Sequence, residues 1–81
     1  STGKLSYKDK YALEQLPGRM AALEEEIAAQ NALLADSELF ARDPDAFEAA
    51  AEALKQAEAE LAAAEDQWLE LEVAREEGEG A

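Results

Sequence analysis

Apolar residues recur through both halves of the chain at alternating steps of three and four positions. In the first half they are Leu13, Leu16, Met20, Leu23, Ile27 and Leu34, with Gln30 at one step of the series. In the second half they are Phe47, Ala50, Leu54, Ala57, Leu61, Ala64, Trp68 and Leu71. This spacing is typical of helices that supercoil around each other, each presenting one apolar seam. The pattern therefore predicts two helices that pack along their length.

The composition limits how large the core between these helices is. The chain has 81 residues, of which 48% are hydrophobic, but twenty of these are alanine and only eleven are leucine. A buried alanine contributes much less apolar area than a leucine, so the large apolar residues suffice for one seam but not for a layered globular core. Abundant Ala, Glu and Leu are also typical of long helices and coiled coils.

Helix-capping signals divide the chain. Residues 1–5 are predicted to be the end of a linker, and Ser6 is a suitable N-cap for a first arm over 6–35. The connection is predicted over 36–43, after which Asp43-Pro44 would cap a second arm over 44–77. Residues 78–81 are predicted to form a disordered tail. Because Pro17 lacks an N–H group, the first arm is expected to kink there.

A short connection forces the two arms to run antiparallel. We therefore predict an all-α fold, an antiparallel two-helix coiled-coil hairpin over 6–77 that is monomeric. The preferred register places Leu23 beside Leu61 and Ile27 beside Ala57, because the arms then end flush. An alternative register, with Leu23 beside Leu54, would leave the second arm overhanging.

The residue types present exclude several kinds of chemistry. The chain contains no His and no Cys, so zinc sites, thiol nucleophiles and imidazole bases are absent. Carboxylates are plentiful, but a two-helix seam offers no cleft to hold a catalytic pair. We expect a non-catalytic module without a cofactor of its own. No apolar run approaches the length of a membrane span, so the default expectation is a cytoplasmic protein without membrane contact.

Two polar or aromatic features allow alternative interpretations. Gln30 occupies a seam position, where it would either select the register or simply reach water from the edge of the seam; the second interpretation is preferred. Trp68, with Tyr7 and Tyr11 at the start of the other arm, would form either a platform for stacking bases or the closed end of the core. The structural interpretation is again preferred.

Most of the few basic residues gather at one end of the predicted hairpin. The chain has seven bases against twenty acids, a net charge of −13. Five of the seven would lie at the base of the hairpin: Lys4, Lys8, Lys10, Arg19 and Arg75. They would either contact phosphates or merely offset part of the acidic charge. On composition alone the second interpretation is favoured, because a strongly negative chain repels polyanions.

Several motifs resemble a known family. Lys-Leu-Ser-Tyr-Lys-Asp at 4–9, Leu-Glu-Gln-Leu-Pro at 13–17 and Leu-Glu-Glu-Glu-Ile at 23–27 resemble the C-terminal domain of ABC-F ATPases of the Uup kind. Arg-Asp-Pro at 42–44 and Gln-Trp-Leu-Glu-Leu-Glu at 67–72 agree with it. Lys-Leu-Ser-Tyr-Lys is fairly specific, whereas Ala/Glu heptads match any coiled coil.

The resemblance implies both a fold and a role. The family's C-terminal domain is a coiled-coil hairpin regarded as a DNA- or RNA-binding appendage of ATPases that work at ribosomes or on DNA. It implies upstream ATPase domains in the same chain, which would hold ATP and Mg²⁺, since these residues contain no phosphate-binding loop. The partner would be DNA or ribosomal RNA, bound weakly through the five bases named above. Family members are usually more basic than this chain.

Two other functions fit the same pattern. The hairpin would serve as a purely structural arm, a spacer or a docking surface for another protein. It would also fit the helical arm of a tRNA-handling enzyme, an interpretation that architecture alone suggests.

Overall fold

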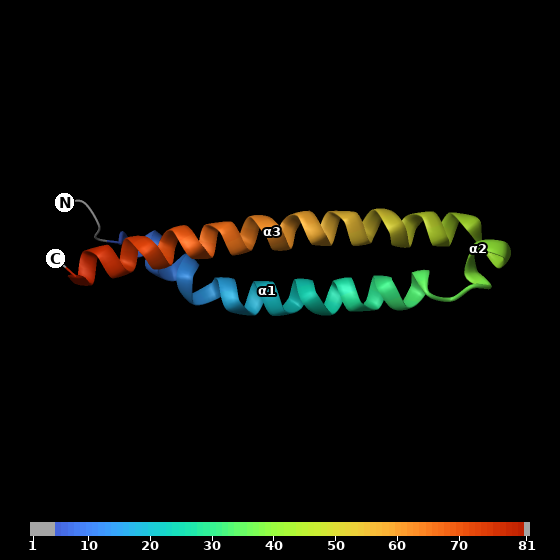
Figure 1. Ribbon diagram of the computed structural model, residues 1–81, viewed down its shortest axis with the longest axis horizontal. Helices are drawn as coiled ribbons and strands as arrows, with labels where there is room; N and C mark the ends of the chain where they lie inside the picture. Colours follow the sequence, from blue (N-terminus) through green and yellow to red (C-terminus); the bar gives the residue numbers. More distant parts are fainter. Residues whose placement is uncertain (1–4, 81) are drawn as a thin grey trace.

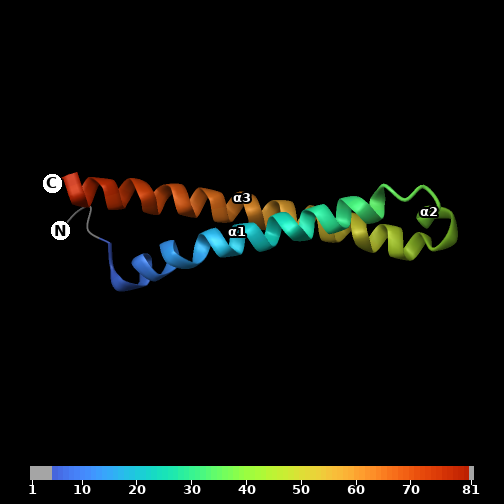
Figure 2. The same cartoon turned by 90° about the horizontal axis from the view of Figure 1, so that it is seen from below.

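The fold is a long helical rod, obtained as a computed structural model that describes residues 5–80. Helix α1 (Tyr7–Leu34) is followed by the short α2 (Leu39–Arg42) and by α3 (Pro44–Gly80). Helices α1 and α3 lie side by side and run in opposite directions, with α2 at the end far from both termini (Figures 1 and 2). The molecule measures 59 × 17 × 14 Å. Its all-helical class is as predicted, and within the described residues no helix is long and apolar enough to cross a bilayer.

Both long helices begin at the predicted caps. The Ser6 hydroxyl accepts a hydrogen bond from the Asp9 backbone N–H at 3.1 Å, so it satisfies one of the unpaired donors of the first turn. The Asp43 carboxylate accepts one from the Ala46 N–H, also at 3.1 Å, and Pro44 follows it as the first residue of α3. Proline suits this position because the missing N–H would have no helical partner there.

The connection contains a helical turn that the sequence analysis did not predict. The Asp36 carboxylate accepts a hydrogen bond from the Glu38 N–H at 3.0 Å, which turns the chain into α2. Leu39 of this turn is buried, with 7% of its surface exposed. Phe40 and Phe47 form a T-shaped aromatic pair with ring centroids 5.3 Å apart. A turn of four residues is too short to show a helical spacing of apolar residues, so its sequence predicts a loop.

The seam between α1 and α3 is buried where the spacing predicts. The most buried residues are Leu16 and Leu23 of α1 and Ala50, Ala57 and Ala64 of α3, each exposed by 7% or less. The other predicted seam residues of both helices are half-buried. Small residues on α3 thus lie on the face that packs against the leucine-bearing face of α1, which allows a close approach of the two helices.

The contacts at the base of the rod agree with the preferred register. Leu13 shares a surface depression with Trp68 and Glu72, which this register brings to its level. The individual pairing of Leu23 with Leu61 stays a prediction.

Helix α1 is continuous through Pro17, so the proline does not divide it. Packing of the seam on both sides of this point supplies the stabilisation that one lost backbone hydrogen bond removes. The kink expected near Pro17 stays a prediction.

Helix α3 continues beyond the predicted end of the second arm at 77, as far as Gly80. Extending an existing helix adds one hydrogen bond per residue, and this offsets the cost of about 1 kcal/mol that each glycine carries. Residues 1–4 and Ala81 lie outside the described residues, and with them most of the predicted linker and the end of the predicted tail.

Replacing Ala57 by leucine is expected to destabilise the protein. Ala57 is 3% exposed, so a larger side chain would push α1 away from α3, at a cost of about 1–3 kcal/mol. Urea denaturation followed by far-UV circular dichroism measures this. The control is Ala59→Leu on the exposed face of α3, expected to stay within about 0.5 kcal/mol of the parent. Equal effects of the two variants would contradict the close approach.

Replacing Gly18 by alanine is expected to stabilise the protein. A Cβ atom at Gly18 would meet no atom within 4 Å, and the residue is in the interior of α1. Alanine loses less backbone entropy on folding, which gives a gain of about 0.5–1 kcal/mol. A thermal melt should show a midpoint several degrees higher, and the exposed Ala28→Gly substitution in the same helix should shift it in the opposite direction.

Candidate nucleic-acid interface

The first turns of α1 present basic side chains to solvent. The Ser6 cap starts the helix so that Lys8 and Lys10 both lie in its first turns, and both residues are exposed. Asp9 between them is half-buried and favourably placed beside the positive end of the helix dipole. The fifth predicted base at this end, Lys4, lies outside the described residues.

The arginines differ from the lysines in having carboxylate partners. The Arg19 guanidinium donates to Glu60 of α3 at 2.6 Å, and this pair joins the two long helices. Arg75 donates twice to Glu72, from Nε to Oε1 and from Nη2 to Oε2, both at 2.9 Å. Arg42 lies 3.6 Å from Asp36. The ion pairs between described residues therefore all involve arginine, and Lys8, Lys10 and Lys55 join none of them.

These pairs change what the predicted bases offer to a ligand. The Arg19 and Glu60 side chains are 57% and 37% exposed, so their attraction is screened by water and worth at most about 1 kcal/mol. The Arg75 pair is more sheltered, with Glu72 24% exposed. A phosphate would have to compete with the carboxylate in either pair. The lysines face no such competition.

The Arg75 hydrogen bonds also act on Glu72. They favour the charged form of the carboxyl group and lower the pKa of Glu72 below its ordinary value, while partial desolvation opposes the shift. Neither Glu72 nor Glu60 was among the residues predicted to form the site. Glu72 lies three residues before Arg75, and Glu60 lies across the seam from Arg19. Many other carboxylates of the chain have similar spacing to a base, so spacing alone did not identify these two.

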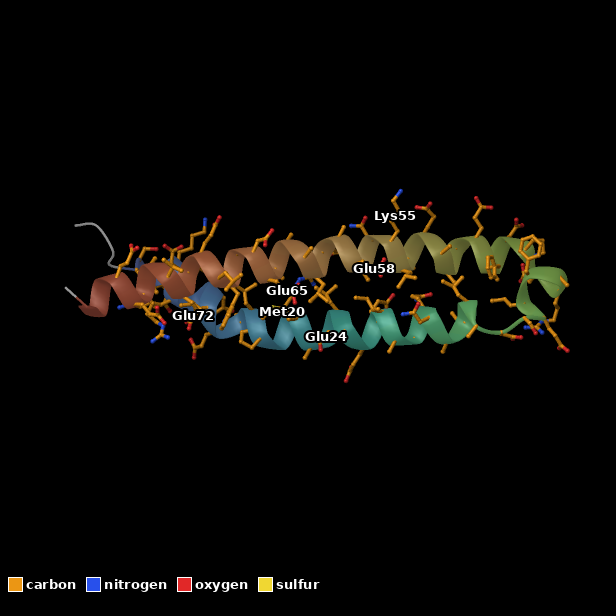
Figure 3. The ribbon with its side chains drawn as sticks, viewed as in Figure 1. Met20, Glu24, Lys55, Glu58, Glu65 and Glu72 are labelled. Carbon is orange, nitrogen blue, oxygen red and sulfur yellow. The ribbon has the colours of Figure 1, made fainter. Side chains whose placement is uncertain are left out.

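The structure brings only some of the predicted bases together. Lys10 and Arg75 line one depression at the base of the rod, which Trp68 and Glu72 also line. Arg19 lines a separate depression with Leu16 and Glu60. Figure 3 shows Glu72 on the part of α3 that lies beside the beginning of α1. Among the described residues, Lys8 and Lys10 thus share the first turns of α1, Lys10 also shares a depression with Arg75, and Arg19 lies apart.

Charge is unevenly divided along the chain. Residues 1–19 carry four bases and two acids, whereas residues 20–81, which include the second half of α1, carry three bases and eighteen acids. The start of α1 and the end of α3 lie at the same end of the rod (Figure 1), so the basic first turns of α1 and the acidic last turns of α3 are neighbours there. The basic surface is therefore narrow and confined to the first turns of α1.

Trp68 and Gln30 lie as their preferred interpretations require, whereas the two tyrosines do not. Trp68 is half-buried, as the structural interpretation requires, but Tyr7 and Tyr11 are 86% and 56% exposed and do not close the core. Gln30 donates a hydrogen bond to Glu26 of its own helix at 3.0 Å. That bond lies along α1 rather than across the seam, in agreement with the preferred interpretation.

Comparison with known proteins decides the family. The sequence model of the ABC transporter C-terminal domain matches residues 4–73. The chain belongs to this family. Two relatives from Haemophilus influenzae, an ATP-binding protein Uup-like and the ATP-binding protein Uup, are each 44% identical over 69 residues, or 85% of this chain. The resemblance to Uup-like ABC-F proteins is confirmed.

This ABC transporter C-terminal domain is a small part of its relatives. The chain spans 15% of the length of the Uup-like protein and 11% of that of Uup. No solved structure matches it significantly.

Replacing Arg75 by glutamine is expected to raise the pKa of Glu72 back toward the ordinary value. In the folded protein this pKa is lowered, so the pair stabilises the fold above the unfolded pKa of about 4.3 and loses that contribution as pH falls through the folded pKa. A carboxyl ¹³C titration by NMR gives the midpoint. Lys55→Gln, which removes the same charge elsewhere on α3, should leave the midpoint unchanged. An unchanged midpoint in Arg75→Gln would refute the assignment.

Proposed function

We propose that this domain is the non-catalytic C-terminal arm of a cytoplasmic ABC-F type ATP-binding protein. The arm is an antiparallel coiled-coil hairpin, kinked near Pro17, that contacts DNA or ribosomal RNA weakly through its base. ATP and Mg²⁺ would be held by ATPase domains upstream in the same protein, not by these residues. The observation that carries the nucleic-acid contact is the exposure of Lys8 and Lys10 in the first turns of α1, without carboxylate partners among the described ion pairs.

Free lysines are suited to this contact because a phosphate gains their charge without displacing another group. Lys4 precedes them in the sequence and would add a third charge. Arg19 and Arg75 are proposed as secondary contacts, which a phosphate would reach only in competition with Glu60 and Glu72. The matched stretch of the family begins at residue 4 and so includes all of these bases except Arg75.

Electrostatics limits the strength of the contact. Neutralising about three phosphates gives a slope of about −2 to −3 in the logarithm of affinity against the logarithm of salt concentration. The acidic remainder of the rod repels the strand, so the isolated domain should bind at about 10⁻⁴ M or more weakly. Tethering to upstream domains would raise the effective concentration to a range in which so weak a contact is occupied.

A titration with short duplex DNA and with an RNA hairpin at low salt tests the proposal. Amide NMR shifts are expected to centre on residues 7–11. The double substitution Lys8→Gln with Lys10→Gln should weaken binding by at least about tenfold at low salt, because two of about three phosphate contacts are lost. Lys55→Gln removes an equally exposed lysine from the middle of α3 and should leave affinity within about twofold.

Two results would contradict the proposal. Shifts centred on Leu39–Arg42 would place the contact at the opposite end of the rod. No shift at millimolar nucleic acid would leave the arm a spacer or a protein-docking surface.

A further inference from the structure

An open groove near the base of the rod has a floor and a rim of different chemistry. Its floor is apolar and is formed by Pro17, Met20, Trp68 and Leu69. Its rim carries three carboxylates, Glu24 from α1 and Glu65 and Asp66 from α3. Figure 3 shows Met20 and Glu65 next to each other between the two helices, with Glu24 further along α1. We call this site the acidic groove.

The side of the groove formed by α1 is low because Ala21, which lines it, carries only a methyl group. Leu69 on the side formed by α3 is left uncovered. Leu69 is 54% exposed, and Val73, one turn further along the same face, is 51% exposed. Together they extend the apolar floor toward the C-terminal end of α3.

The rim carboxylates are available to a ligand. Glu24, Glu65 and Asp66 are all exposed and take part in none of the ion pairs of the described residues. Three negative charges around exposed Leu69 and half-buried Met20 and Trp68 are complementary to positive charges interspersed with apolar side chains. Lysine and arginine meet both conditions, because their aliphatic stems cover apolar surface while their charged ends reach the rim.

Charge also excludes other occupants. A second copy of this chain would bring another net charge of −13 against three carboxylates, and nucleic acid would bring phosphates. We propose that the acidic groove docks a protein segment that carries lysine or arginine between apolar residues, such as one face of a basic amphipathic helix. This site uses none of the lysines proposed to contact phosphate, so the two proposals stand or fall separately.

Trp68 is the only tryptophan of the chain and lies in the groove floor, so its fluorescence reports occupancy. The probe is a synthetic amphipathic peptide with Lys and Leu on a helical period, compared with the same peptide carrying Glu in place of Lys. The Lys peptide is expected to shift Trp68 emission and to move the amide signals of residues 18–24 and 65–73. The Glu peptide should do neither.

Matched variants separate the groove from the general negative field. Glu24→Gln with Glu65→Gln should weaken binding of the Lys peptide by about 3- to 30-fold, the range expected for two exposed ion pairs. Glu48→Gln with Glu52→Gln removes the same charge from exposed sites of α3 outside the groove and should change it by less than about twofold. Leu69→Ala should also weaken binding, since it removes part of the floor.

Three results would overturn the proposal. Equal binding of the Glu peptide would remove the role of charge complementarity. Equal losses of affinity for the Lys peptide in the two double variants would show that the net negative charge of the chain, and not the groove, attracts the peptide. Sedimentation showing self-association that buries Trp68 would make a second copy the occupant.

Discussion

The close approach of α1 and α3 is the contact on which the rest of the structure depends. Without it, neither long helix has a comparable apolar surface against which to bury its seam, because the only other helix of the described residues, α2, has four residues. Ala50, Ala57 and Ala64 are spaced so that all three fall on one face of α3, and all are exposed by 7% or less. Their small size allows the face of α1 that carries Leu16 and Leu23 to approach α3 closely. A thin seam of this kind is extended rather than deep, which accounts for a rod 59 Å long.

The close packing of α1 and α3 also determines which charged side chains stay at the surface. Two helices that share one narrow seam leave most of their faces in water, so nearly all of the twenty acids stay exposed or half-exposed. The arginines form ion pairs with nearby carboxylates. The Arg19–Glu60 pair, with 2.6 Å between Nη2 and Oε1, joins the two helices. Lysines in the first turns of α1 escape such pairing, because that stretch of the chain has few acids.

Much of this fold was predictable because long periodic patterns and helix caps are local signals. The seam residues and the caps at Ser6 and Asp43 follow from spacing and residue type alone. Spacing and residue type did not predict the turn at Leu39–Arg42 or the extension of α3 to Gly80. Both depend on hydrogen bonds that residue type only weakly favours. Within the candidate interface, the sequence placed bases at one end of the rod. It did not distinguish free lysines from paired arginines, because pairing depends on side-chain positions across two helices.

The acidic groove was not predictable for a related reason. Its lining combines Met20 and Ala21 of one helix with Trp68 and Leu69 of the other, and only the packed pair of helices brings these residues together. At this end of the rod charge is divided across the axis rather than along it. Residues 1–19 hold four bases and two acids, while residues 65–81 hold one base and seven acids. A polyanion near the base would therefore be attracted to the α1 side and repelled from the α3 side. The proposed phosphate contact is directional as well as weak, and it leaves the α3 side of the groove facing away from the strand.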